Sequence, residues 1–141
     1  MVPYAFTAQE IEKTRQFLID HVRKNSYIRN GTVKGNPLVP YKDVASFLGY
    51  SIDDQFDGDR MGIVVGRASE ENLPASGVLI SAIVVSVEHG RPGTGFYNCA
   101  RENGIFNSTK KKFNPDGTEE IAFWNDQLTK VVAKYGKRGK S

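Results

Sequence analysis

The side chains that most often carry chemistry are few in this chain and lack their usual companions. The single cysteine is Cys99, and no histidine or lysine lies near it in the sequence to stabilise a thiolate. Ser81 and Ser86 precede His89, but their spacing fits no serine-based catalytic triad. The glycine-rich stretch from Gly90 to Gly95 lacks the Lys-Ser/Thr ending of a phosphate-binding loop. We therefore predict a protein without enzymatic activity.

The acidic segment from Ser51 to Asp59 invites a metal interpretation. A calcium loop that began at Asp53 would need a bidentate glutamate at its twelfth position, and that position is Val64. A helix N-terminus that collects acidic side chains at the positive end of its dipole is the alternative. His21 has no second ligand at a helical spacing. We expect neither a metal ion nor another cofactor.

Length and composition indicate one domain. A chain of 141 residues can bury roughly two thirds of its unfolded surface, so we expect a single domain over residues 1–135 and a basic, disordered tail over 136–141. One cysteine permits no intrachain disulfide. The start of the chain has no basic and apolar regions of a secretion signal, and no apolar run approaches the ~18 residues of a membrane span. We expect a cytoplasmic protein with no membrane partner.

The net charge of +3 conceals an uneven distribution. Basic residues gather in Lys110–Lys112 and in the C-terminal stretch from Gln127 to Ser141, which has no acidic residue, and the remainder is net acidic. Basic segments of this kind can contact nucleic acid or an acidic partner. A solvated helix face and a frayed tail are the alternative for each segment alone.

Two amphipathic helices are predicted at the ends of the chain. Thr7 to Glu10 has the form of a capping box, and apolar residues then recur at helical spacing from Ala8 to Lys24. A second apolar stripe runs from Thr118 or Glu119 to Tyr135 and contains Trp124, which we assign to packing.

The region after the first helix is predicted to be less regular. Tyr27–Val39 is interrupted by glycine, asparagine and proline, which indicates a connector with at most one short strand at Gly31–Lys34. Pro40 suits the first turn of a helix over Tyr41–Leu48, and Gly49 suits its left-handed end.

A loop over Ser51–Asp59 is predicted to lead into a helix over Arg60–Leu73, which Pro74 closes. The most apolar stretch, Val78–Val85, then predicts a strand buried on both faces at the centre of the core.

The glycine-rich turn Gly90–Tyr97 follows this predicted strand. Thr94 can cap a short helix that stops at Gly104; alternatively, Phe96 and Tyr97 end a second strand.

These elements predict an α+β fold that is mostly helical, with a small central β-sheet between the N-terminal and C-terminal amphipathic helices. Two short helices with a tight join, followed by a strand and a glycine-rich wing, have the layout of a winged helix-turn-helix.

Four motifs in the middle of the chain support a family relationship. They are Val39-Pro40-Tyr41-Lys42-Asp43-Val44-Ala45, Val65-Gly66-Arg67-Ala68-Ser69-Glu70-Glu71-Asn72, Ile80-Ser81-Ala82-Ile83-Val84-Val85 and the turn from Gly90 to Phe96. In this order and spacing, residues 39–97 resemble the C-terminal, DNA-binding half of the alkylguanine-DNA alkyltransferases and their catalytically inactive alkyltransferase-like relatives. The resemblance implies a winged-helix domain that contacts duplex DNA.

The departures from this family concern its chemistry. Ser81 and Ala82 stand where the family has its alkyl-accepting cysteine and the adjacent histidine, and a neutral serine without a base is a poor nucleophile. Ile63 stands where the family has the arginine that enters the duplex. We therefore expect a non-enzymatic domain that contacts DNA through basic segments and the glycine-rich wing. The candidate nucleic-acid-binding residues are Tyr41, Arg60, Arg67, Arg91, Lys110, Lys111, Lys112, Lys137 and Arg138.

An alternative function follows from the acidic character of Pro40–Leu73, which would repel a phosphate backbone. The chain would then be a protein-binding module, such as a phage- or mobile-element-encoded inhibitor or adaptor of a nucleic-acid enzyme. In this alternative a basic protein surface meets the acidic patch of Asp53, Asp54, Asp57 and Asp59.

Overall fold

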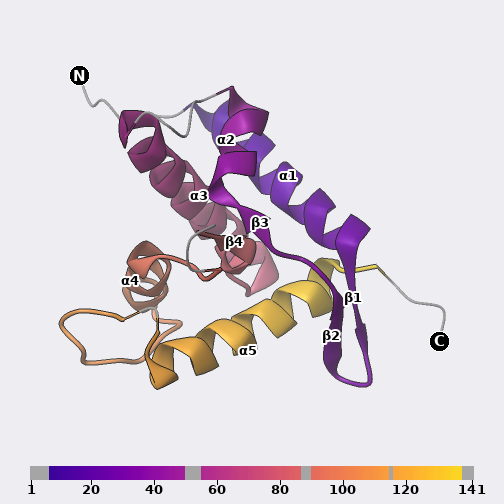
Figure 1. Cartoon of the computed structure of the whole chain (residues 1–141), viewed down its shortest axis with the longest axis vertical. Helices are drawn as coiled ribbons and strands as arrows, with labels where there is room; N and C mark the ends of the chain where they lie inside the picture. Colours follow the sequence, from indigo (N-terminus) through magenta and orange to yellow (C-terminus); the bar gives the residue numbers. More distant parts are fainter. Residues whose placement is uncertain (1–6, 50–54, 87–89, 115, 138–141) are drawn as a thin grey trace.

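The computed structural model describes residues 7–49, 55–86, 90–114 and 116–137, with the backbone alone for 55–61. Helices dominate an α+β fold in these residues (Figure 1). The elements are α1 (Ala8–Asn25), β1 (Ser26–Arg29), β2 (Thr32–Gly35), β3 (Val39–Pro40), α2 (Tyr41–Leu48), α3 (Gln55–Ser76), the 3₁₀ helix η1 (Ile80–Ile83), β4 (Val84–Val85), α4 (Thr94–Glu102) and α5 (Thr118–Tyr135). Within the same ranges, no helix is long and apolar enough to cross a membrane.

The predicted ends of α1 and α2 are confirmed. The Thr7 hydroxyl accepts a hydrogen bond from the Glu10 backbone at 3.0 Å, and the Glu10 carboxylate accepts one from the Thr7 backbone at 3.3 Å. This capping box satisfies two donors that the first turn leaves unpaired. α2 begins directly after Pro40, and Gly49 ends it in the left-handed region with φ 84°. The helix predicted to end at Tyr135 is also confirmed, as α5.

The predicted connector after α1 is in fact a β-hairpin. β1 and β2 pair antiparallel, and Asn30 and Gly31 join them with φ of 53° and 75°. Positive φ at both central positions is the geometry that Asn-Gly favours in two-residue hairpin turns. The pair Ile28 and Val33 packs against the core, which gives the hairpin its one apolar face. The one short strand predicted at Gly31–Lys34 corresponds to β2, and its partner β1 was not predicted.

The apolar stretch Val78–Val85 is buried throughout, as predicted, but it is not a continuous strand. Residues 80–83 form η1, and only Val84 and Val85 pair, in parallel, with Val39 and Pro40. An unbroken apolar run shows that a segment is buried, but it does not distinguish a strand from a buried turn. The predicted central sheet is thus reduced to this two-stranded pair, separate from the hairpin.

Side chains from α3 and α5 satisfy part of the backbone of this buried segment, where a sheet would otherwise have done so. The Ser81 amide donates to the Ser69 hydroxyl of α3 at 3.3 Å. The Trp124 indole donates to the Ala82 carbonyl at 2.8 Å. The Leu79 amide donates to the Gln127 side chain at 3.2 Å. Trp124 is also 9% exposed, so its predicted role in packing is confirmed.

The next two helices differ from the prediction at their ends. α3 starts at Gln55, within the predicted acidic loop, and continues through Pro74 to Ser76. The helix closes when the Gly77 amide, at φ 72°, bonds to the Leu73 carbonyl at 2.8 Å. α4 confirms the helical alternative for Phe96 and Tyr97 and excludes the second strand, although Gly93 rather than Thr94 occupies the N-cap position.

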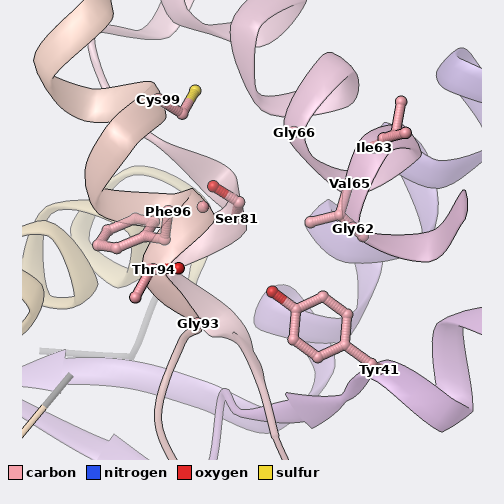
Figure 2. A pocket seen from close by; sticks show the side chains of 11 residues that line it. Tyr41, Gly62, Ile63, Val65, Gly66, Ser81, Gly93, Thr94, Phe96 and Cys99 are labelled. Atoms are coloured by element: carbon pink, nitrogen blue, oxygen red, sulfur yellow. The ribbon is translucent and has the colours of Figure 1, made fainter. Parts of the chain in front are cut away.

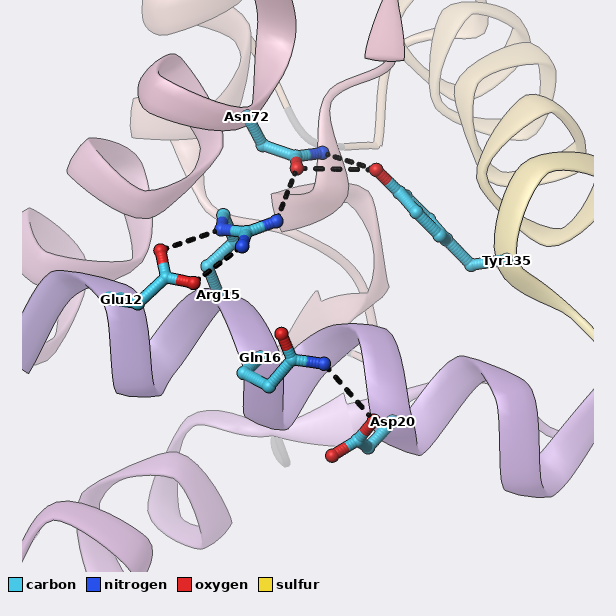
Figure 3. Close-up of polar contacts among 6 residues, drawn as sticks. All are labelled: Glu12, Arg15, Gln16, Asp20, Asn72 and Tyr135. Atoms are coloured by element: carbon cyan, nitrogen blue, oxygen red, sulfur yellow. Dashed lines mark hydrogen bonds and ion pairs between the residues drawn. The ribbon is translucent and has the colours of Figure 1, made fainter. Parts of the chain in front are cut away.

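A buried amide joins three of the helices (Figure 3). Asn72 of α3 is 4% exposed; its side-chain oxygen accepts a hydrogen bond from Arg15 of α1 at 3.2 Å, and its nitrogen donates to the Tyr135 hydroxyl of α5 at 3.1 Å. Glu12 holds the Arg15 guanidinium in place. Asn72, part of a family-like motif in the sequence, therefore has a structural role here.

Candidate functional site

A pocket of about 480 Å³ opens where α2, α3, η1 and α4 meet (Figure 2). It combines segments that the resemblance singled out: the start of α2, the middle of α3, the buried η1 and the glycine-rich turn before α4. The lining residues are Tyr41, Gly62, Ile63, Val65, Gly66, Ser81, Gly93, Thr94, Gly95, Phe96 and Cys99. A volume of this size lies within the range of small-ligand sites.

Tyr41 occupies its place because of the β3–β4 pair. Val39 and Pro40 are fixed beside Val84 and Val85, so the first residue of α2 projects across the pocket. Its hydroxyl points toward the start of α4 (Figure 2). Burial raises the pKa of Tyr41, and a hydrogen bond with the Gly93 backbone opposes this shift only partly. The phenol is therefore neutral at physiological pH and can donate a hydrogen bond to a ligand.

Glycines on α3 and on α4 keep the pocket open. A Cβ atom added to Gly66 in α3 would meet no other atom within 4 Å, and the same holds for Gly62 and Gly95. None of these three has a positive φ, so the backbone does not require glycine there. The absent side chains instead leave room for a ligand to approach the backbone closely.

The Ser81 hydroxyl and the Cys99 thiol are not activated for nucleophilic attack. Ser81 Oγ donates to Ser69 Oγ at 3.0 Å, and this second hydroxyl is no base. Burial, followed by the nearby carboxylates of Glu70 and Glu102, raises the pKa of Cys99 to about 11. The thiolate is consequently scarce at neutral pH. None of the described lining residues is charged, so the pocket suits a neutral ligand.

The candidate basic residues near α4 are partly engaged within the protein. Arg91 pairs with Asp116, which ties the glycine-rich turn to the loop before α5. Arg101 of α4 donates to the Lys110 carbonyl and lies over the Phe113 ring at 4.6 Å. These contacts place the lysine-rich loop beside α4, where Lys111 and Lys112 are exposed.

Lys110, by contrast, is committed to the fold. Its ammonium bonds to Glu120 at 2.7 Å and lies 3.4 Å from Glu119. Glu120 is fully buried and also accepts a 2.7 Å bond from the Asn114 amide. Lys110 thus anchors the loop to the first turn of α5, and only its two lysine neighbours remain available for a phosphate backbone.

The Glu120→Gln variant is expected to melt at a lower temperature than the wild type at pH 7. The Lys110 ammonium, followed by the Asn114 amide, holds the pKa of Glu120 below its usual value of 4.5. A folded-state pKa below the unfolded value stabilises the fold above about pH 4.5, and this stabilisation is lost as the pH falls through the folded-state pKa. The difference in Tm should therefore shrink on acidification. Thermal unfolding followed by circular dichroism at several pH values measures it.

The exposed Glu119→Gln variant is the control and should show a smaller, less pH-dependent change. A Tm difference for Glu120→Gln that stayed constant down to strongly acidic pH would contradict the assignment.

The two predicted basic segments lie at opposite ends of α5, so they do not form one surface (Figure 1). Lys110 lies at the first turn of this helix. Lys137 follows the last turn, where its amide donates to the Ser26 carbonyl at 2.7 Å. The 18 residues of α5 between them span about 27 Å. Arg138 lies outside the described residues.

The remaining candidates lie on or before α3. Arg67 is exposed on this helix. The backbone of Arg60, Asp57 and Asp59 is helical, and their side chains lie outside the described part of the chain, as do Asp53 and Asp54 altogether. The acidic patch of the alternative function is therefore not tested by the structure.

Sequence reasoning identified Tyr41 but missed other members of the pocket. Cys99 has no neighbour in the sequence that would point to a site, and the partnership of Ser81 with Ser69 has no signal in the sequence because it joins η1 to α3. The spacing of Gly62 and Gly66, one turn apart on α3, was the available signal for an open helix face. The sequence matches no protein-family model, and no curated protein or solved structure is significantly similar to it.

Proposed function

We propose that this chain is a non-enzymatic, winged-helix-like nucleic-acid-binding domain whose pocket receives an unstacked base of duplex DNA. The observation that carries the proposal is the pocket itself: a hollow of about 480 Å³ between α2, α3 and the glycine-rich turn, with no charge among its described lining residues and a neutral tyrosine in its wall.

The pocket chemistry favours a base over other ligands. A nucleobase is flat and uncharged and has hydrogen-bonding edges, and proteins that extrude a base hold it among aromatic and apolar side chains. Phe96, Val65 and Ile63 supply apolar surface, while Tyr41 and Thr94 supply hydroxyls. A phosphate or a carboxylate would meet no cation among the described lining residues.

The absence of an activated nucleophile supports binding without reaction. Ser81 takes the position of the reactive cysteine in the resembled family, and it is hydrogen-bonded to a second serine. Cys99, at the far side of the pocket, is protonated at neutral pH. A base held here would be recognised rather than modified.

Phosphate contacts near the pocket can come from Arg67 on α3 and from Lys111 and Lys112 beside α4. These three are exposed, and none forms an ion pair with a described carboxylate. Their number is small, so we expect modest affinity and a shallow salt dependence, because the slope of log K against log[salt] scales with the number of phosphate contacts.

A salt titration with fluorescently labelled DNA tests the proposal. The wild type is expected to bind a duplex with a central mismatch more tightly than the matched duplex, because a mismatched base costs less to unstack. Fluorescence anisotropy gives both affinities. If the wild type bound neither duplex at low ionic strength, the proposal would be contradicted.

A further inference from the structure

The ends of α1 and α5 meet the β1–β2 hairpin at one end of the molecule, away from α4 (Figure 1). The bond from the Lys137 amide to the Ser26 carbonyl fastens the end of the chain to β1. A hollow of about 440 Å³ lies at this junction, and three of its five lining residues are cations. They are Arg23, Lys134 and Lys137, next to Tyr135 and Gly136.

The hairpin adds two more cations on its outer face. Ile28 and Val33 are directly paired and face the core, so the neighbouring pairs, Tyr27 with Lys34 and Arg29 with Thr32, face outward. Each cation therefore lies opposite an uncharged residue. Arg29 and Lys34 are diagonal neighbours on this face, a spacing of about 7–8 Å. We call Arg23, Arg29, Lys34, Lys134 and Lys137 the hairpin pole.

The cations of the hairpin pole are largely without acidic partners. Elsewhere, Arg15, Arg91, Lys110 and Lys130 each pair with a carboxylate, whereas Arg67, Lys111 and Lys112 pair with no described carboxylate. In the pole only Arg23 has one, Asp20 at 3.7 Å; no described carboxylate pairs with the other four cations.

Helix dipoles explain only part of this cluster. Cations in a last helical turn offset the negative end of the helix dipole, which accounts for Arg23 and Lys134. Arg29, Lys34 and Lys137 belong to no helix, and so their accumulation needs another explanation.

We propose that the hairpin pole binds the phosphate backbone of duplex DNA, at a surface separate from the base pocket. The five cations have one acidic partner among the described residues, so they form a positive electrostatic surface that complements the phosphates of DNA. An anionic membrane would also attract them, but stable membrane attachment needs apolar side chains to insert beside the charges. The one large apolar side chain exposed in the described residues is Phe47, which lies on α2.

The hairpin pole and the pocket are close enough to contact one duplex. Gly35, the last residue of β2, and Tyr41 are separated by six residue steps, which span at most about 20 Å of extended chain. That distance corresponds to about six base pairs along the duplex axis. This spacing allows the pole to hold flanking phosphates of the same duplex whose base enters the pocket, a step that rests on the proposed function.

The test compares a double variant of the pole with a control variant in the same anisotropy titration over a range of salt. Arg29→Gln/Lys34→Gln removes two charges from the outer face of the hairpin pole, and Lys13→Gln removes one from an exposed position of α1 that belongs to neither the pole nor the pocket. The pole variant is expected to lose about tenfold in affinity for a matched duplex at low salt. Its slope of log K against log[salt] should be smaller in magnitude by about 2.

The control variant should retain the wild-type slope. Both variants should melt near the wild-type temperature, because the exchanged side chains are exposed.

The outcomes separate this proposal from the proposed function. If the slope of log K against log[salt] is unchanged in the pole variant, the proposal that the hairpin pole binds DNA is overturned, even where the wild type prefers the mismatched duplex. A reduced slope supports it, even where that preference is absent and the pocket proposal fails. Binding of the wild type to phosphatidylserine vesicles but not to duplex DNA would overturn it in favour of a membrane surface.

Discussion

The Gly66→Leu variant is expected to bind matched duplex DNA like the wild type and to lose the preference for a mismatched duplex. A side chain at position 66 projects into open space in the pocket rather than into neighbouring atoms, so leucine fills the volume that the base would occupy. The affinity for the mismatched duplex should fall by roughly tenfold, or about 1.4 kcal/mol. A duplex with 2-aminopurine at the mismatch reports the same loss, because its fluorescence rises only when the base is unstacked.

Stability cannot account for this expected loss. Replacing glycine inside α3 should stabilise the helix, by about 0.5–1 kcal/mol for alanine and by a similar amount for leucine. Ala75→Leu is the matched control, since it adds a leucine to an exposed position of the same helix outside the pocket. Retention of the mismatch preference by Gly66→Leu would show that the base does not enter this pocket.

The Leu79→Ala variant is expected to be strongly destabilised, by about 2–5 kcal/mol. Leu79 is fully buried in the segment on which α1, α3 and α5 converge, and its backbone is held by Gln127. The neighbouring helices are held in place by these contacts, so they can move little into the cavity that the alanine substitution leaves. Chemical denaturation followed by circular dichroism gives the free energy of unfolding.

Leu128→Ala provides the comparison, because Leu128 is half-buried on α5 and should lose only about 1 kcal/mol. Similar losses in the two variants would contradict the central position of Val78–Val85 in the core. Leu79 is not among the residues that line the pocket, so its replacement tests the core and not the proposed ligand site.

Local chemistry in the sequence was sufficient to predict most helices. The Thr7 capping box and the glycine at position 49 act within a few residues, so the ends that they specify could be inferred without knowledge of the fold. Asn30-Gly31 carries the same kind of local signal, because it is the preferred pair for a two-residue hairpin turn. The hairpin is therefore predictable from the sequence, although the glycine, asparagine and proline around it are also typical of an irregular connector.

The buried segment was not predictable to the same degree. Its apolar run correctly indicated the core, but the choice between a strand and η1 depends on Trp124 and Gln127. Those residues are distant in sequence and supply the hydrogen bonds that a neighbouring strand would have supplied.

The site shows a similar limit. Tyr41 could be identified from a motif, whereas the opposed positions of Lys110 and Lys137 depend on the path of α5 through the molecule. The hairpin pole could not be inferred from charge runs, because its members come from four separate elements and the tail.

The parallel pair of β3 and β4 also has a consequence for the order of folding. It joins Val39 to Val84, and closing a chain segment of that length costs about 3 kcal/mol or more in entropy. Such non-local contacts slow folding relative to those within a helix or a hairpin. Tyr41 directly follows β3, and Ser81 lies shortly before β4. The two sides of the pocket therefore come together only when β3 and β4 have paired. Ligand binding at the pocket would therefore report on the completed fold, while the hairpin, with its local pairing, can form its outer face earlier.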